Sequence, residues 1–217
     1  MIFQVDYEQI EMLLWVFVSI AIALYTILFI YRAFKKDKSA RFFNLAAAAI
    51  FFSLFFDSFK RIFFQGNIIA IFVANVALVL AMIPMVYYLE KNIIGRTKKI
   101  LTLLAFIFVM IFIAGAMYFN FEQSIMNLLI MLPLAIEILV IGCSYIYLMV
   151  KGAGVLRKAS AIIFFGLLIA LGFWVIHGQI GRSSPQPMLE FVDLIGILAP
   201  SGVIIGFGIA APGFTMV

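Results

Sequence analysis

Seven long apolar stretches divide this chain of 217 residues. A helix needs about 20 mostly apolar residues to cross the hydrocarbon core of a membrane. The sequence therefore predicts seven spans, over residues 10–31, 42–64, 67–89, 100–119, 124–150, 159–177 and 191–214. The short linkers predict antiparallel neighbours. We expect an all-α bundle of seven transmembrane helices, forming a single domain over residues 1–217 in the cell membrane.

Composition excludes several classes of protein. The chain is 66% hydrophobic and 12% charged, whereas soluble domains run near half apolar and a quarter charged. Soluble enzymes and disordered regulators are therefore excluded. The chain has one cysteine, Cys143, and one histidine, His177, too few for a thiol pair, a three-histidine zinc site or bis-histidine haem ligation. We expect no enzymatic activity, no metal and no cofactor.

Charge placement predicts the orientation in the membrane. Three linkers hold most of the 15 basic residues: RAFKKDKSAR, EKNIIGRTKK and KGAGVLRK, at residues 32–41, 90–99 and 151–158. Basic linkers remain in the cytoplasm, so the N-terminus is expected outside and the C-terminus inside. Topology accounts for the net charge of +5, and no nucleic-acid partner is expected. The basic turns suit anionic lipid or a protein partner.

Glu137 is the most unusual residue because it lies within an apolar span, in MLPLAIEILVIG. At 1.5 Å per residue it lies roughly 20 Å from the outer boundary, near the midplane. One interpretation is a protonated carboxyl hydrogen-bonded between helices, with Tyr25 and Asn75 as candidate partners. The other is a direct role in binding a ligand or a proton. Pro133 comes one turn earlier and predicts a kink beside the acid.

A second polar cluster ends the second span, in FFDSFKRIFF. Asp57, Lys60 and Arg61 are spaced i, i+3, i+4 and share one helix face. They predict either a local ion pair, with the two cations reaching the outer interface, or the mouth of an outward-facing vestibule. His177 and Asp193 are expected at the same level. The predicted ligand-binding residues are Asp57, Lys60, Arg61, Asn75, Glu137, His177 and Asp193.

Small residues recur along the last span. The segment GVIIG, Gly202–Gly206, has the small-xxx-small spacing that lets helices approach closely. The ordinary expectation is packing within the bundle, and the alternative is a contact between two copies of the chain.

Two basic turns carry a resemblance to a known group of proteins. EKNIIGRTKKIL at 90–101 and GAGVLRKASAIIFFG at 152–166 resemble cytoplasmic turns of uncharacterised archaeal seven-helix membrane modules. Some of those modules look like the sensing part of histidine kinases. The resemblance implies a sensory membrane module, although this sequence contains no kinase domain. A retinal protein is not expected, because the last span has no lysine.

Three functional classes follow. The first is a receptor-like or sensory protein that binds a small ligand in an outward-facing polar vestibule and signals through a separate membrane or cytoplasmic partner. The second is a non-catalytic subunit of a larger membrane complex. The third is a small proton-coupled transporter that uses Glu137.

Overall fold

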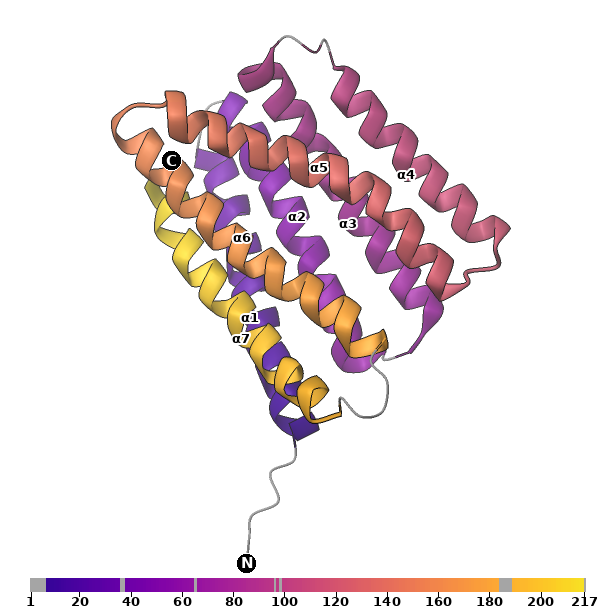
Figure 1. Cartoon of the computed structure of the whole chain (residues 1–217). Helices are drawn as coiled ribbons and strands as arrows, with labels where there is room; N and C mark the ends of the chain where they lie inside the picture. The colour runs from indigo at the N-terminus through magenta and orange to yellow at the C-terminus, as the bar shows by residue number, and fades with distance from the viewer. Residues whose placement is uncertain are drawn as a thin grey trace, which may run out of the picture. The chain divides into compact units, whose positions relative to one another are not determined.

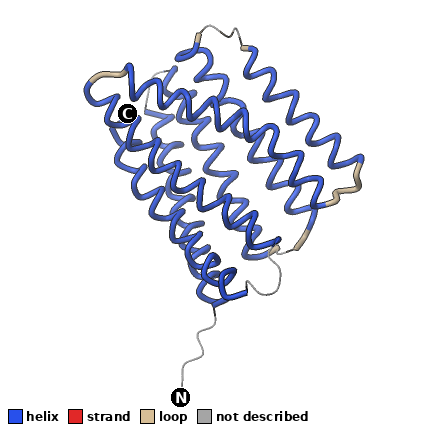
Figure 2. The backbone as a smooth tube through the Cα atoms, viewed as in Figure 1, coloured by secondary structure: helices blue, strands red, loops and turns tan. Residues whose placement is uncertain are grey.

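The computed structural model describes residues 7–35, 38–64, 66–95, 97, 99–183 and 189–216. Side chains are described for most of these residues, but not for those at 7–8, 38–39, 175–183, 189–196 and 215. Helices separated by short loops account for this whole part of the chain (Figure 2).

Eight helical elements follow one another in the described residues. In chain order they are α1 (Tyr7–Lys35), α2 (Lys38–Phe63), α3 (Ile68–Leu89), the π-helix η1 (Glu90–Ile94), α4 (Ile100–Tyr118), α5 (Gln123–Lys151), α6 (Gly154–Ser183) and α7 (Leu189–Met216).

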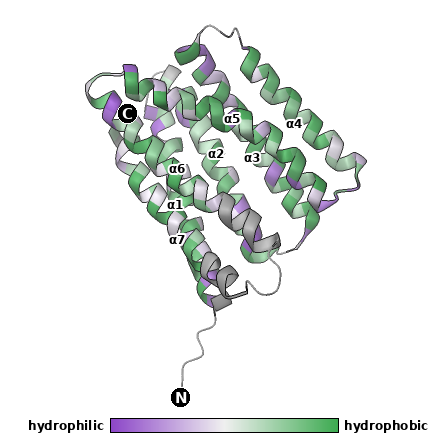
Figure 3. Cartoon of the chain, viewed as in Figure 1, coloured by the Kyte–Doolittle hydropathy of each residue, from purple (hydrophilic) through white to green (hydrophobic). Residues whose placement is uncertain are grey.

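Seven of the helices in the described residues are long and apolar enough to cross a membrane. Hydrophobic residues cover most of their length, and hydrophilic residues gather toward their ends (Figure 3). This confirms the all-α class and the seven candidate spans. Helices α1, α5, α6 and α7 extend beyond the predicted spans at both ends, because hydropathy marks only the apolar part of a helix. The bounds of α3 and α4 agree with the predicted spans to within one residue. The span predicted at 159–177 belongs to a helix that begins at Gly154 and ends at Ser183.

The chain divides into two compact units. The first, here the α6–α7 unit, comprises Met1–Ala21 and Tyr145–Val217. The second, here the α2–α5 unit, comprises Ile22–Ser144. Helices α1 and α5 each contribute residues to both units.

Glycine brings the two main helices of the α6–α7 unit together, side by side (Figure 1). A Cβ atom on Gly206 of α7 would lie 2.6 Å from the carbonyl oxygen of Gly166 and 2.8 Å from the Cα of Ala170, both on α6. Only glycine allows the two backbones to approach this closely. The small-residue face predicted at Gly202–Gly206 is therefore used for packing inside the molecule.

Two tryptophans pack within the same unit. The rings of Trp15 on α1 and Trp174 on α6 meet edge to face, with centroids 5.4 Å apart. Such a pair stabilises the contact by roughly 0.5–1.5 kcal/mol beyond the area that it buries.

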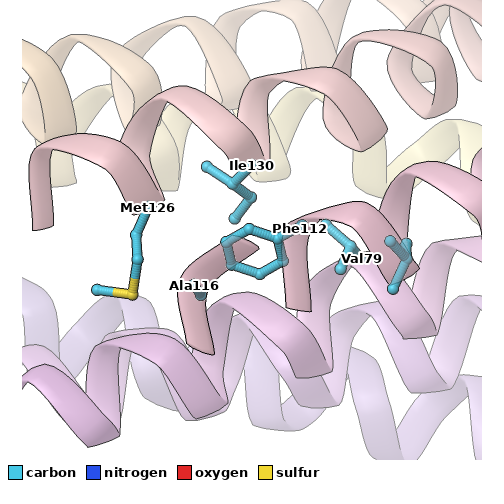
Figure 4. Close-up of a cluster of buried hydrophobic side chains, with 6 residues drawn as sticks. Val79, Phe112, Ala116, Met126 and Ile130 are labelled. Carbon is cyan, nitrogen blue, oxygen red and sulfur yellow. The ribbon is translucent and has the colours of Figure 1, made fainter. Parts of the chain in front are cut away.

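The α2–α5 unit has a core built by α3, α4 and α5. Figure 4 shows the side chains of Phe112 and Ile130 close together in this cluster of buried residues. The fully or largely buried members are Val79, Val109, Phe112, Ala116, Met126 and Ile130. In this unit α3 packs against both α2 and α4. The cluster fixes the first half of α5, and therefore the face on which Glu137 lies.

Candidate functional site

Glu137 lies on the buried stripe of α5. The stripe follows helical spacing and comprises Met126, Ile130, Pro133, Glu137, Val140 and Ser144. Glu137 is completely buried, and neither carboxyl oxygen has a hydrogen-bond partner in the part of the chain that the structure describes. Burying a polar group without a hydrogen bond costs roughly 2–7 kcal/mol. The two carboxyl oxygens of Glu137 could therefore accept hydrogen bonds that no described residue donates.

The preceding turn of α5 adds a second hydrogen-bond acceptor, the backbone carbonyl oxygen of Leu129. Side chains on a helix lean toward its N-terminus, so the Glu137 carboxyl lies over the turn that contains Pro133. Pro133 is inside α5 and fully buried. It has no N–H to donate to the carbonyl of Leu129, its usual partner in a helix. This part of α5 is therefore rich in acceptors and poor in donors.

The predicted partners of Glu137 do not bind it. Tyr25 and Asn75 are both half-buried, yet neither donates to the Glu137 carboxyl. The Tyr25 ring instead stacks on Phe51, with centroids 5.1 Å apart. The prediction of a carboxyl hydrogen-bonded to these two side chains is wrong, because similar depth in a bundle does not ensure that two helix faces point toward each other.

Asp57, Lys60 and Arg61 form the local ion pair that their spacing predicts. The Lys60 Nζ lies 2.5 Å from Asp57 Oδ1, and the Arg61 Nε lies 3.0 Å from Asp57 Oδ2. Each oxygen of the carboxylate thus accepts from a different cation. Pairing with two cations offsets part of the cost of burying this carboxylate.

Lys60 is buried rather than extended into water. Its exposed fraction is 4%, and its ammonium group turns back onto Asp57 on the same helix. The Lys60 ammonium therefore does not extend into water as predicted, and its depth in a membrane stays a prediction. A carboxylate one turn away offers the ammonium a charge-assisted hydrogen bond, which is shorter and stronger than a neutral one.

His177 and Asp193 complete the predicted binding set, and their side chains lie outside the described residues. Asn75 lies within α3. The vestibule that would join these residues to Asp57 and Glu137 therefore stays a prediction. In the described part of the chain, no group of three or more histidine, cysteine, aspartate or glutamate residues is arranged to hold a metal ion.

Glu90 is a buried acid whose importance the sequence does not reveal. It is 2% exposed and begins η1, directly after α3. Its Oε1 accepts from the Thr97 hydroxyl at 2.6 Å and from the Leu101 N–H at 3.0 Å. Its Oε2 accepts from the N–H and the hydroxyl of Thr102, at 2.9 and 2.6 Å.

The Glu90 carboxylate thus occupies the N-terminus of α4, where unpaired N–H groups and the helix dipole favour a negative charge. A π-helix turn and a left-handed residue, Lys99 with φ 72°, bend the chain back toward the acid. An acid at the end of one span and threonines near the start of the next are the only sequence signal of this contact, and they are too common to predict it.

No family model, no curated protein and no solved structure matches this chain. The resemblance to archaeal sensory modules accordingly stays a prediction. The functional argument rests on the residues themselves, above all on two buried glutamates. Glu90 accepts four hydrogen bonds, and Glu137 has no hydrogen-bond partner in the described residues.

Proposed function

We propose that this chain is a receptor-like, multi-pass membrane protein whose small ligand hydrogen-bonds to the carboxyl of Glu137. The observation that supports this proposal is the complete burial of that carboxyl without a partner in the described residues. Ionisable groups inside a span are costly and mark functional sites by default. A ligand that supplies the missing hydrogen bonds would remove that cost when it binds.

The surroundings of Glu137 specify the chemistry of the ligand. The acceptor-rich turn from Pro133 to Glu137 calls for a hydrogen-bond donor, such as an amine or a hydroxyl group. The rest of the α5 stripe is mainly apolar, so the body of the ligand would be apolar as well. We therefore propose a small amphiphile with an N–H or O–H group as the ligand class.

Signalling would follow from the position of Glu137 beside Pro133. Proline kinks give a helix a point at which it bends, and a ligand seated there stabilises one bend angle over another. We propose the N-terminus outside and the C-terminus inside, so that the basic turns present the resulting shift to a separate membrane or cytoplasmic partner. Asp57, Lys60 and Arg61 would contribute polarity at the outer mouth of the site.

The test is native mass spectrometry of the full chain after gentle extraction from its own membranes. We expect a reproducible small-molecule adduct on the wild type that Glu137→Gln loses. The control is Glu122→Gln, which changes an exposed carboxyl near the start of α5 and keeps the adduct. Thermal unfolding of both variants checks that each is folded.

Two outcomes would overturn the receptor proposal. If the wild type and Glu137→Gln carry the same adduct, the ligand lies elsewhere. If instead a protein of fixed ratio accompanies the chain and no adduct is found, the chain is a subunit of a larger complex.

The same carboxyl also supports a proton-coupled transporter, because a buried acid binds a proton as readily as a ligand. Proton flux into liposomes separates the two functions. A transporter predicts flux that requires Glu137, whereas a receptor predicts none.

A further inference from the structure

One end of the α2–α5 unit gathers cations and aromatic rings from four helices. The Arg41 Nε, near the start of α2, donates to the carbonyl oxygen of Ala33 near the end of α1, at 3.0 Å. The Phe42 ring lies 6.0 Å from that of Tyr87 near the end of α3. The Lys99 Nζ at the start of α4 lies 5.5 Å from the centroid of the same tyrosine.

The exposed basic residues and the aromatic rings at these helix ends are here called the cationic collar. It comprises Tyr31, Lys35, Arg41, Phe42, Tyr87, Tyr88, Lys91 and Lys99. Because the contacts join helix ends to helix ends, the collar lies where the apolar spans stop.

Within the part of the chain that the structure describes, no ion pair offsets the positive charge of the collar. Lys35, Arg41, Lys91 and Lys99 are all exposed, and none of them forms an ion pair within the described residues. The acid that is closest in sequence to Lys91 is Glu90, which is buried and already accepts four hydrogen bonds. Its carboxylate is therefore satisfied by α4 and does not neutralise the surface lysines.

Aromatic rings hold two of these cations in place. The Lys35 Nζ lies 4.6 Å from the centroid of the Tyr31 ring, and Lys99 is held in the same way on Tyr87. A cation over an aromatic face gains about 0.5–1 kcal/mol at an exposed site. Each ammonium keeps N–H groups for a further acceptor. The collar thus combines positive charges and aromatic rings at the same helix ends.

We propose that the cationic collar binds the phosphate headgroup of an anionic phospholipid. Span ends lie at headgroup depth, where tyrosine rings and basic side chains gather, and anionic lipids attract clustered lysine and arginine. A phospholipid matches both properties of the collar, because its phosphate meets the cations while its glycerol and upper chains meet the rings. An acidic protein segment would match the charge alone. This inference does not depend on the ligand of Glu137.

The test titrates the detergent-solubilised full chain with phosphatidylglycerol and, separately, with phosphatidylcholine, and counts bound lipid by native mass spectrometry. We expect phosphatidylglycerol to bind more tightly. The double variant Lys91→Gln/Lys99→Gln removes two exposed charges. The loss of each charge should weaken phosphatidylglycerol binding by about fivefold. The matched control is Lys151→Gln/Lys158→Gln, which also removes two exposed lysines but leaves the collar intact and the binding unchanged.

A further variant, Tyr87→Leu, tests the aromatic part of the collar. It should weaken phosphatidylglycerol binding without changing the net charge of the chain. Equal affinity for the two lipids in the wild type would overturn the proposal, as would an equal loss in both double variants. Displacement of the lipid by a glutamate-rich peptide at equal concentration would identify an acidic protein as the occupant instead.

Discussion

Two buried acids show how differently the same side chain is accommodated. Glu90 accepts four hydrogen bonds from the loop before α4 and its first turn, whereas the Glu137 oxygens have no partner in the described residues. The first arrangement stabilises a turn, since each N–H of a helix start needs an acceptor. The second costs stability, which natural proteins accept mainly at functional sites.

Replacing Glu90 with alanine tests the first role. The Glu90→Ala variant leaves the Leu101 and Thr102 N–H groups without their acceptor, so the free energy of unfolding should fall by about 1–3 kcal/mol. The measurement is a denaturant titration of the protein in detergent. The Glu122→Ala control removes an exposed carboxylate that accepts from Ser124, and it should change stability by less than about 0.5 kcal/mol. Equal losses in the two variants would show that Glu90 does not stabilise the turn.

At the scale of helices, the close packing of α6 against α7 depends on glycines, which have no side chain. Gly206 and Gly166 face each other at a distance where no Cβ fits. Helices in a membrane gain little from the hydrophobic effect when they associate, so close packing and weak hydrogen bonds provide most of the attraction. The small residues of α7 therefore stabilise the fold by allowing contact.

A pair of glycines on α7 gives a matched test of this packing. Gly206→Ala adds a methyl group against the α6 backbone and should lower the free energy of unfolding by about 1–3 kcal/mol. Gly208 has nothing within 4 Å of its built Cβ position, so Gly208→Ala should leave stability unchanged or raise it by up to about 1 kcal/mol. Denaturant titration of both variants compares them directly. A stable Gly206→Ala variant would mean that the helices separate at little cost.

For the molecule as a whole, charge and helix count point to the same topology. The described residues hold seven candidate spans, and an odd number of crossings would put the two termini on opposite sides of a membrane, as we propose. The three basic linkers fall between alternate pairs of spans, as the positive-inside rule requires for one side. Large apolar side chains such as Phe34 and Leu128 are exposed on the helices, as lipid contact favours.

Labelling single cysteines tests the proposed orientation. In a Cys143→Ser background, Glu122→Cys places a thiol between α4 and α5, and Asn92→Cys places one between α3 and α4; both positions are exposed. A membrane-impermeant maleimide should label the first in intact cells and the second only after permeabilisation. The reverse pattern would place the N-terminus inside.

The site was less predictable than the fold. The ion pair at Asp57 follows from spacing on one helix, so the sequence was enough to predict it. The partners of Glu137 were predicted wrongly, and the binding of Glu90 to α4 was missed, because both depend on how different parts of the chain approach each other. Thr102 lies twelve positions after Glu90, beyond the reach of any helical periodicity.

The sequence by itself determined the helical class, the seven candidate spans and the expected orientation. These properties depend on residues that are neighbours in the sequence, because each span must be long and apolar enough on its own to cross the lipid. Only the tertiary structure decided which glycines face each other, where cations and rings form the collar, and which buried acid is satisfied. A hydrogen bond or a close contact forms within a few ångströms, and only packing brings residues from separate helices to that distance.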